Sequence, residues 1–178
     1  MRPDDVCGTR DDGFTLVELL IVVVIIGVLA AIAVPGLRSA RMTGNEASAV
    51  VSLKAINGAQ MTYAASCGRN AFAVQLSVLG TPPPGANTAY LSADLGLSGV
   101  PQVNGYLFAL AAGAGDRPGP MDCSGNLTHT TYYASAAPLA FGSTGTKSFA
   151  TNAANTIWQV AAAAAPTEPF GPPAVPVQ

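Results

Sequence analysis

The sequence predicts an α+β fold, in which one long N-terminal helix packs on an antiparallel sheet of three or four strands. Two observations lead to this prediction. From Phe14 to about Cys67 the apolar residues follow a helical pattern, first on all sides and then on one face only. After Gly105, short segments rich in aromatic and β-branched residues alternate with glycine- and asparagine-containing turns. The length that follows the apolar helix suits one small domain.

The first part of the predicted helix is apolar enough to cross a membrane. Sixteen residues from Leu19 to Val34 carry no charged or hydrogen-bonding side chain. Together with Phe14–Val17 they span about 31 Å as a helix, which is close to the thickness of one hydrocarbon core. Glu18 stands at the head of this segment. A carboxylate costs about 2.5–3.5 kcal/mol at mid-membrane, although a place in the first helical turn lowers that cost.

Beyond Pro35 the pattern becomes amphipathic. A proline in a membrane-associated helix kinks it without ending it. A stripe with four-three spacing predicts the face that packs on the domain, and Gly68 predicts the helix end. The stripe comprises Ala49, Leu53, Ile56, Gln60 and Tyr63.

The remaining elements follow from turn residues and strand composition. Residues 68–101 predict a structured loop that docks on the sheet through Leu76, Leu79, Leu91, Leu95 and Leu97. Strands are expected at Gly105–Leu110, Thr130–Ala136, Lys147–Thr151 and Thr156–Val160. Residues 161–178, with five prolines and five consecutive alanines, predict a flexible tail without a fold of its own.

The run Gly13-Phe14-Thr15-Leu16-Val17-Glu18, followed by the apolar helix, closely resembles the processing site of type IV pilins and type II secretion pseudopilins. In that family a prepilin peptidase cuts after the glycine and methylates the new amino terminus, which here is Phe14. The resemblance implies that Glu18 pairs with the terminal amine of a neighbouring subunit during assembly. Gly27 and Pro35 fall where many members carry a helix-loosening glycine and proline.

This resemblance implies a domain plan and a set of partners. The plan has a leader at 1–13, a transmembrane and filament-core helix at 14–35, a pilin-like globular domain at 36–160 and the tail at 161–178. The partners would be other copies of the chain in a helical filament, a prepilin peptidase, an inner-membrane platform protein and an assembly ATPase. The chain would first sit as a single-pass protein in a bacterial inner membrane and later in a periplasmic or extracellular filament.

Two cysteines remain once a leader containing Cys7 is removed. Cys67 and Cys123 form an even pair without metal-ligand spacing, which predicts one disulfide and a domain outside the cytoplasm. Such a crosslink would stabilise the fold by about 4 kcal/mol. Two separate buried thiols are the alternative.

The sequence offers little chemistry for catalysis, and we expect neither an enzyme nor a cofactor. His129 is the only histidine, so a metal site or a Ser-His-acid triad would need unusual partners. Asp116 and Asp122 give only a weak calcium pattern. The chain after Gly13 has equal numbers of acids and bases, which argues against general binding of nucleic acid. The bases are Arg38, Arg41, Lys54, Arg69, Arg117 and Lys147, and the acids are Glu18, Glu46, Asp94, Asp116, Asp122 and Glu168.

The interpretation as a type IV pilus-like subunit has alternatives. A secretion pseudopilin or a minor pilin would share the same N-terminal segment. A soluble exported domain would arise if signal peptidase cut after Ala31-Ile32-Ala33. A binding protein held permanently by one membrane helix would explain the apolar segment but not the motif at Gly13–Glu18.

Overall fold

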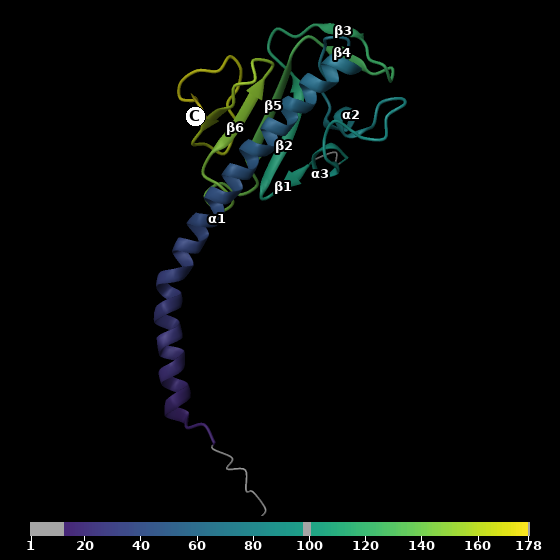
Figure 1. Ribbon diagram of the computed structural model, residues 1–178. Coiled ribbons are helices and arrows are strands. Elements are labelled where there is room, and N and C mark those ends of the chain that lie inside the picture. The colour runs from purple at the N-terminus through teal and green to yellow at the C-terminus, as the bar shows by residue number, and fades with distance from the viewer. Residues whose placement is uncertain (1–12, 98–100, 178) are drawn as a thin grey trace, which may run out of the picture. The chain divides into compact units, whose positions relative to one another are not determined.

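The computed structural model describes residues 13–97 and 101–177, so all of the predicted leader at 1–13 except Gly13 lies outside the described residues. The chain divides into two compact units, with the boundary between Arg38 and Ser39. Helix α1 (Leu16–Ser66) contributes to both units (Figure 1). The prediction of an α+β, pilin-like fold with one long N-terminal helix is confirmed.

Helix α1 runs without a break through Pro35. The expected end near Cys67 is confirmed, since the helix ends at Ser66 and the Gly68 N–H caps it by bonding to the Tyr63 carbonyl. In the second unit, one face of α1 is buried against the sheet. All five residues of the predicted stripe are at most 1% exposed: Ala49, Leu53, Ile56, Gln60 and Tyr63.

The sheet that covers this face is larger than predicted. Six antiparallel strands follow the order β1-β2-β5-β6-β7-β8: β1 (Gln102–Val103), β2 (Tyr106–Ala112), β5 (Tyr132–Pro138), β6 (Ser148–Asn152), β7 (Trp158–Val160) and β8 (Val175–Pro176). In β5 alternate residues are buried, and Tyr132, Ala134 and Ala136 join the core with the helix. Figure 1 shows α1 crossing this sheet.

Each of the four expected strands matches an observed one within about two residues, and the additional pairing comes from turns. Val103 pairs with Tyr106 around Asn104 and Gly105, both of which have positive φ. An Asn-Gly pair with this backbone makes a tight hairpin turn, which forms the short strand β1. A second, two-stranded sheet consists of β3 (Pro118–Met121) and β4 (Leu127–His129), which lie between the first two expected strands, where no strand was expected.

The segment between α1 and the sheet holds two short helices, α2 (Leu76–Gly80) and α3 (Ala93–Gly96). Gly80 and Gly96 lie where the helices meet, and a Cβ on either glycine would collide with the backbone of the other. Four of the five leucines expected to anchor this segment are buried, whereas Leu97 is exposed. The prediction of a docked loop therefore holds, and three of its anchors, Leu76, Leu79 and Leu95, lie in the two short helices.

The prediction of a tail without a fold is wrong for residues 161–177. Strand β8 pairs with β7, and the Val177 N–H bonds to the Ile157 carbonyl. The Phe170 ring stacks on Trp158 with the ring centres 5.6 Å apart. The Tyr133 hydroxyl donates to the Pro166 carbonyl at 2.7 Å. Proline and alanine content suggests disorder, but aromatic contacts and one strand pairing order this segment.

Leu53→Ala tests whether the amphipathic stripe holds the helix on the sheet. Leu53 is fully buried in the core, so we expect the substitution to lower the free energy of unfolding by about 2–5 kcal/mol. The matched control is Val51→Ala on the same helix, where the valine is 65% exposed and the loss should stay below about 1 kcal/mol. Urea unfolding of the full chain measures both, and equal losses would contradict the assignment of the buried face.

Candidate processing and assembly segment

The predicted cleavage site leads directly into a capped helix start. The Glu18 N–H donates to Thr15 Oγ1 at 3.2 Å, while Glu18 Oε2 accepts from the Thr15 N–H at 3.1 Å and from its hydroxyl at 2.8 Å. This reciprocal pattern is a capping box, which satisfies N–H groups that the first helical turn leaves free. Glu18 therefore has a local structural role that the sequence analysis did not include, although the Thr-x-x-Glu spacing signals it.

The segment after this cap exposes its apolar side chains. Every residue from Gly13 to Arg41 is exposed, and Phe14 is exposed to 79%. By length and composition, α1 is the one helix in the described part of the chain that could cross a membrane. Isolated exposed leucines are ordinary, but a continuous apolar surface of this kind calls for lipid or a protein partner.

Gly27 and Pro35 lie on this exposed surface, within the continuous part of α1. A Cβ added at Gly27 would meet no other atom within 4 Å, so packing inside the chain does not require a glycine there. Within the described chain, the expected assembly residues Phe14, Glu18, Gly27 and Pro35 thus share one exposed segment. Their proposed partners would have to come from outside it.

The structure joins the two predicted cysteines, and the disulfide between Cys67 and Cys123 is confirmed. The bond ties the residue that follows α1 to the β3–β4 hairpin. Next to it, the buried carboxylate of Asp122 accepts four hydrogen bonds. Its donors are the Tyr63 hydroxyl at 2.9 Å, the Ser124 N–H at 2.8 Å, and the Asn126 N–H and side-chain amide at 2.7 and 3.0 Å.

These hydrogen bonds determine the ionisation of both partners. Burial alone would raise the pKa of the Asp122 carboxyl, but the hydrogen bonds from Asn126, Tyr63 and Ser124 lower it below its ordinary value of 3.8. Burial, together with the contact to Asp122, raises the pKa of the Tyr63 phenol. Tyr63 therefore stays a neutral donor to an ionised carboxylate across the neutral pH range.

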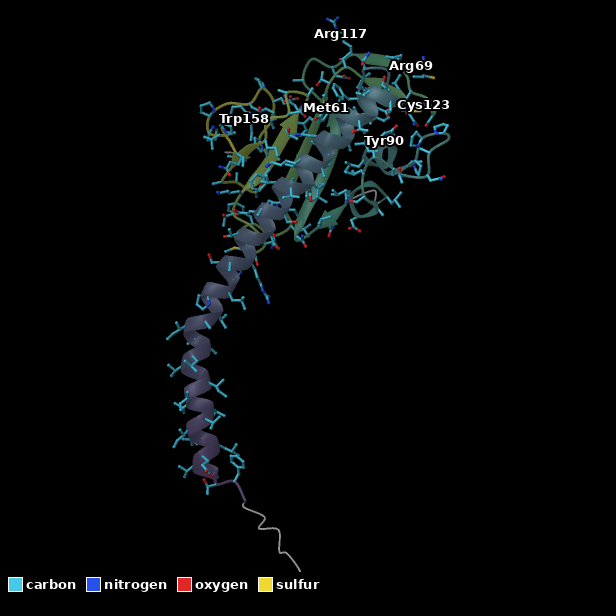
Figure 2. The ribbon with its side chains drawn as sticks, in the orientation of Figure 1. Met61, Arg69, Tyr90, Arg117, Cys123 and Trp158 are labelled. Carbon is cyan, nitrogen blue, oxygen red and sulfur yellow. A yellow bond between two sulfur atoms is a disulfide. The ribbon has the colours of Figure 1, made fainter. Side chains whose placement is uncertain are left out.

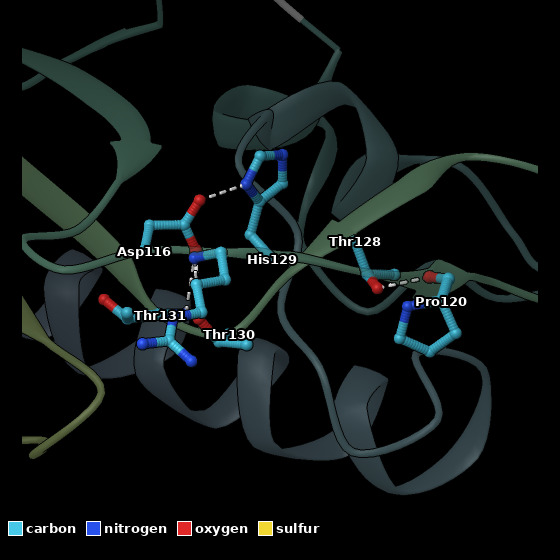
Figure 3. Close-up of polar contacts among 7 residues, drawn as sticks. Asp116, Pro120, Thr128, His129, Thr130 and Thr131 are labelled. Atoms are coloured by element: carbon cyan, nitrogen blue, oxygen red, sulfur yellow. Dashed lines mark hydrogen bonds and ion pairs between the residues drawn. The ribbon is translucent and has the colours of Figure 1, made fainter.

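Asp116 and His129 form a separate pair (Figure 3). Asp116 lies just before β3, and His129 is the last residue of β4. His129 Nδ1 lies 2.5 Å from Asp116 Oδ2. Burial opposes ionisation of Asp116, but the bonds from His129 and the Thr131 N–H outweigh it and lower the pKa of the carboxyl. Asp116 and Asp122 therefore serve different networks, and no three acidic, histidine or cysteine side chains in the described part of the chain gather as a metal site.

Comparison with known proteins supports the N-terminal assignment. Residues 9–34 match the family model of the prokaryotic N-terminal methylation motif. Over 54 residues the chain is 46% identical to the type IV major pilin protein PilA of Myxococcus xanthus (strain DK1622), a match that covers 30% of this chain and 24% of that protein. No solved structure matches the chain significantly. The resemblance to type IV pilins is confirmed, and it lies in the N-terminal part.

Asp122→Asn tests the carboxylate beside the disulfide. An asparagine amide cannot accept from all four donors, so we expect the free energy of unfolding at pH 7 to fall by about 1–3 kcal/mol. Because the folded-state pKa of Asp122 is lowered, its contribution is complete above pH 3.8 and is lost as the pH falls through the lower folded value. The difference between wild type and variant should therefore shrink in acid.

Urea unfolding from pH 7 down to about pH 2 measures this difference. Asp94→Asn is the matched control, because Asp94 is exposed. A difference between wild type and Asp122→Asn that does not change with pH would contradict the ionised role of Asp122.

Proposed function

We propose that this chain is a structural subunit of a type IV pilus-like filament, cut by prepilin peptidase after Gly13, methylated at Phe14 and polymerised through residues 14–35. One observation carries the proposal: the methylation motif leads into an exposed apolar segment, residues 14–35, whose single charged side chain, Glu18, sits in the first turn of α1.

The energetics of assembly follow from the exposed segment. Moving an apolar helix from lipid into a bundle of equally apolar helices costs little, so van der Waals packing and the few polar groups decide whether it associates. The two capping contacts of the Glu18 carboxylate both use Oε2, so Oε1 is the oxygen that would accept from the Phe14 amine of a neighbouring subunit. Two opposite charges that are unfavourable apart in lipid become tolerable when they meet.

The partners and the location follow from the same proposal. An inner-membrane platform and an assembly ATPase would move the subunit from the bacterial inner membrane into the filament, with the disulfide-bonded domain outside the cytoplasm. A secretion pseudopilin or a minor pilin is the second candidate, because it would use the same N-terminal segment. The similarity of that segment to a major pilin favours the pilus subunit.

Two substitutions separate the charge of Glu18 from its capping role. Glu18→Gln keeps an acceptor for the capping box but removes the charge, whereas Thr15→Val removes the cap hydroxyl and keeps the charge. If charge pairing drives assembly, Glu18→Gln should reduce the amount of filament about tenfold or more, while Thr15→Val should retain most of it.

Electron microscopy and immunoblots of filaments sheared from cells measure this amount. The quantity of subunit in the membrane fraction serves as the control for expression and folding. A normal amount of filament from Glu18→Gln would contradict the charge-pairing mechanism, and so would a greater loss of filament in Thr15→Val than in Glu18→Gln.

A further inference from the structure

Two adjoining cavities form a groove on the domain, between the segment that holds α2 and the β3–β4 hairpin. Their volumes are about 310 and 400 Å³, within the range of small-molecule sites, and they share Gln75, Val78 and Asn126 as lining residues. Figure 2 shows Tyr90 and Cys123 on this side of the domain, near the C-terminal end of α1. We call this feature the Gln75 groove.

The floor of the Gln75 groove is held in place. Cys67, which lines the groove, is fixed by its disulfide with Cys123, and the four hydrogen bonds to Asp122 use both oxygens of that carboxylate. The Asn126 amide is oriented because its Nδ2 donates to Asp122, so its carbonyl oxygen is available as an acceptor. A preorganised polar surface binds without first ordering its own side chains.

One wall presents an oriented aromatic ring. The Tyr90 hydroxyl lies 2.8 Å from Ser66 Oγ, and its ring meets the Tyr63 ring edge to face with centres 5.6 Å apart. Val78 and Pro83 line the groove beside it. The wall therefore offers a small apolar surface next to the polar floor.

Most of the remaining polar groups that line the groove are neutral amides and hydroxyls. Gln75 is exposed, and its side chain makes no hydrogen bond to any residue that the structure describes. Ser77, Thr81 and Ser124 add hydroxyl groups. Among the residues that the structure describes, no lysine or arginine lines either cavity, and the acid Asp122 and the imidazole of His129 are both engaged in bonds of their own. A phosphate or polyanionic ligand would find no counter-charge here.

We infer that the Gln75 groove binds a neutral oligosaccharide. A sugar hydroxyl both donates and accepts, and amides and hydroxyls supply both partners. The apolar C–H face of a sugar ring can pack on the Tyr90 ring that lines the groove, while a lipid or an apolar peptide would leave the Asn126 carbonyl oxygen and the Gln75 amide without hydrogen-bond partners. The inference concerns the domain alone and holds whether or not the chain polymerises.

Nuclear magnetic resonance of the full chain tests this inference. The ¹⁵N-labelled protein is held in micelles of a zwitterionic detergent without a sugar headgroup, so that the detergent cannot occupy the groove. Cellotriose, maltotriose and chitotriose are each added to about 10 mM, enough to fill about nine-tenths of a site with a dissociation constant near 1 mM. At least one of them should shift the amide signals of Gln75, Tyr90 and Asn126.

Variants test whether a shift of the amide signals arises from a sugar bound in the Gln75 groove. Gln75→Ala should weaken binding about 2- to 10-fold, because it removes one or two neutral hydrogen bonds without touching the core. Gln102→Ala, an exposed glutamine on edge strand β1, should bind as wild type does. Tyr90→Ala is the second variant and should weaken binding as well, through the lost stacking face.

Three outcomes would overturn the inference. One is the absence of shifts with all three sugars. Another is binding that is equal in wild type, Gln75→Ala and Tyr90→Ala. The third is stronger binding of a heparin hexasaccharide, which would replace the neutral ligand with a polyanion. None of these outcomes bears on filament assembly, which the Glu18 variants measure.

Discussion

The rest of the molecule depends on one constraint: the apolar first half of α1 is left uncovered by the residues that the structure describes. All described residues from Gly13 to Arg41 are exposed, and the residues from Leu19 to Val34 carry no polar side chain. Water is a poor solvent for such a surface, so lipid or other copies of the helix must cover it. The capping box of Thr15 and Glu18 satisfies hydrogen-bonding groups at the start of this helix without any partner.

The second half of the same helix, by contrast, has one face that is buried within the domain. Its buried face organises the domain, and two polar side chains on that face are fully paired. Asn57 donates to Thr151 and accepts from the Tyr132 hydroxyl, while Gln60 makes two bonds with the backbone of Ala73. Apolar contacts alone would tolerate a small rotation of the helix, whereas these directional bonds do not. One helix thus provides both an outward surface and the foundation of the domain.

Prediction from sequence succeeded where the signal was local. Helical spacing identified the buried stripe of α1, and the contiguous motif at Gly13–Glu18 identified the candidate site. The features that the sequence did not predict depend on contacts between residues that are far apart in the chain. Nothing near Asp122 in the sequence indicates that Tyr63 bonds to it, and a Pro-Gly-Pro run is a poor strand signal for β3. Likewise, the order of residues 161–177 comes from Phe170 stacking on Trp158.

The most direct test of the filament proposal is the intact mass and N-terminal sequence of the protein recovered from its native cells. Because the proposed cut follows Gly13 and precedes an exposed Phe14, the proposal predicts a chain that begins with methylated Phe14 and retains its disulfide. A chain that begins at Val34 would contradict it, since the apolar helix and Glu18 would then be absent from the mature protein. A chain that keeps Met1 would also contradict it, and would indicate a permanent membrane anchor.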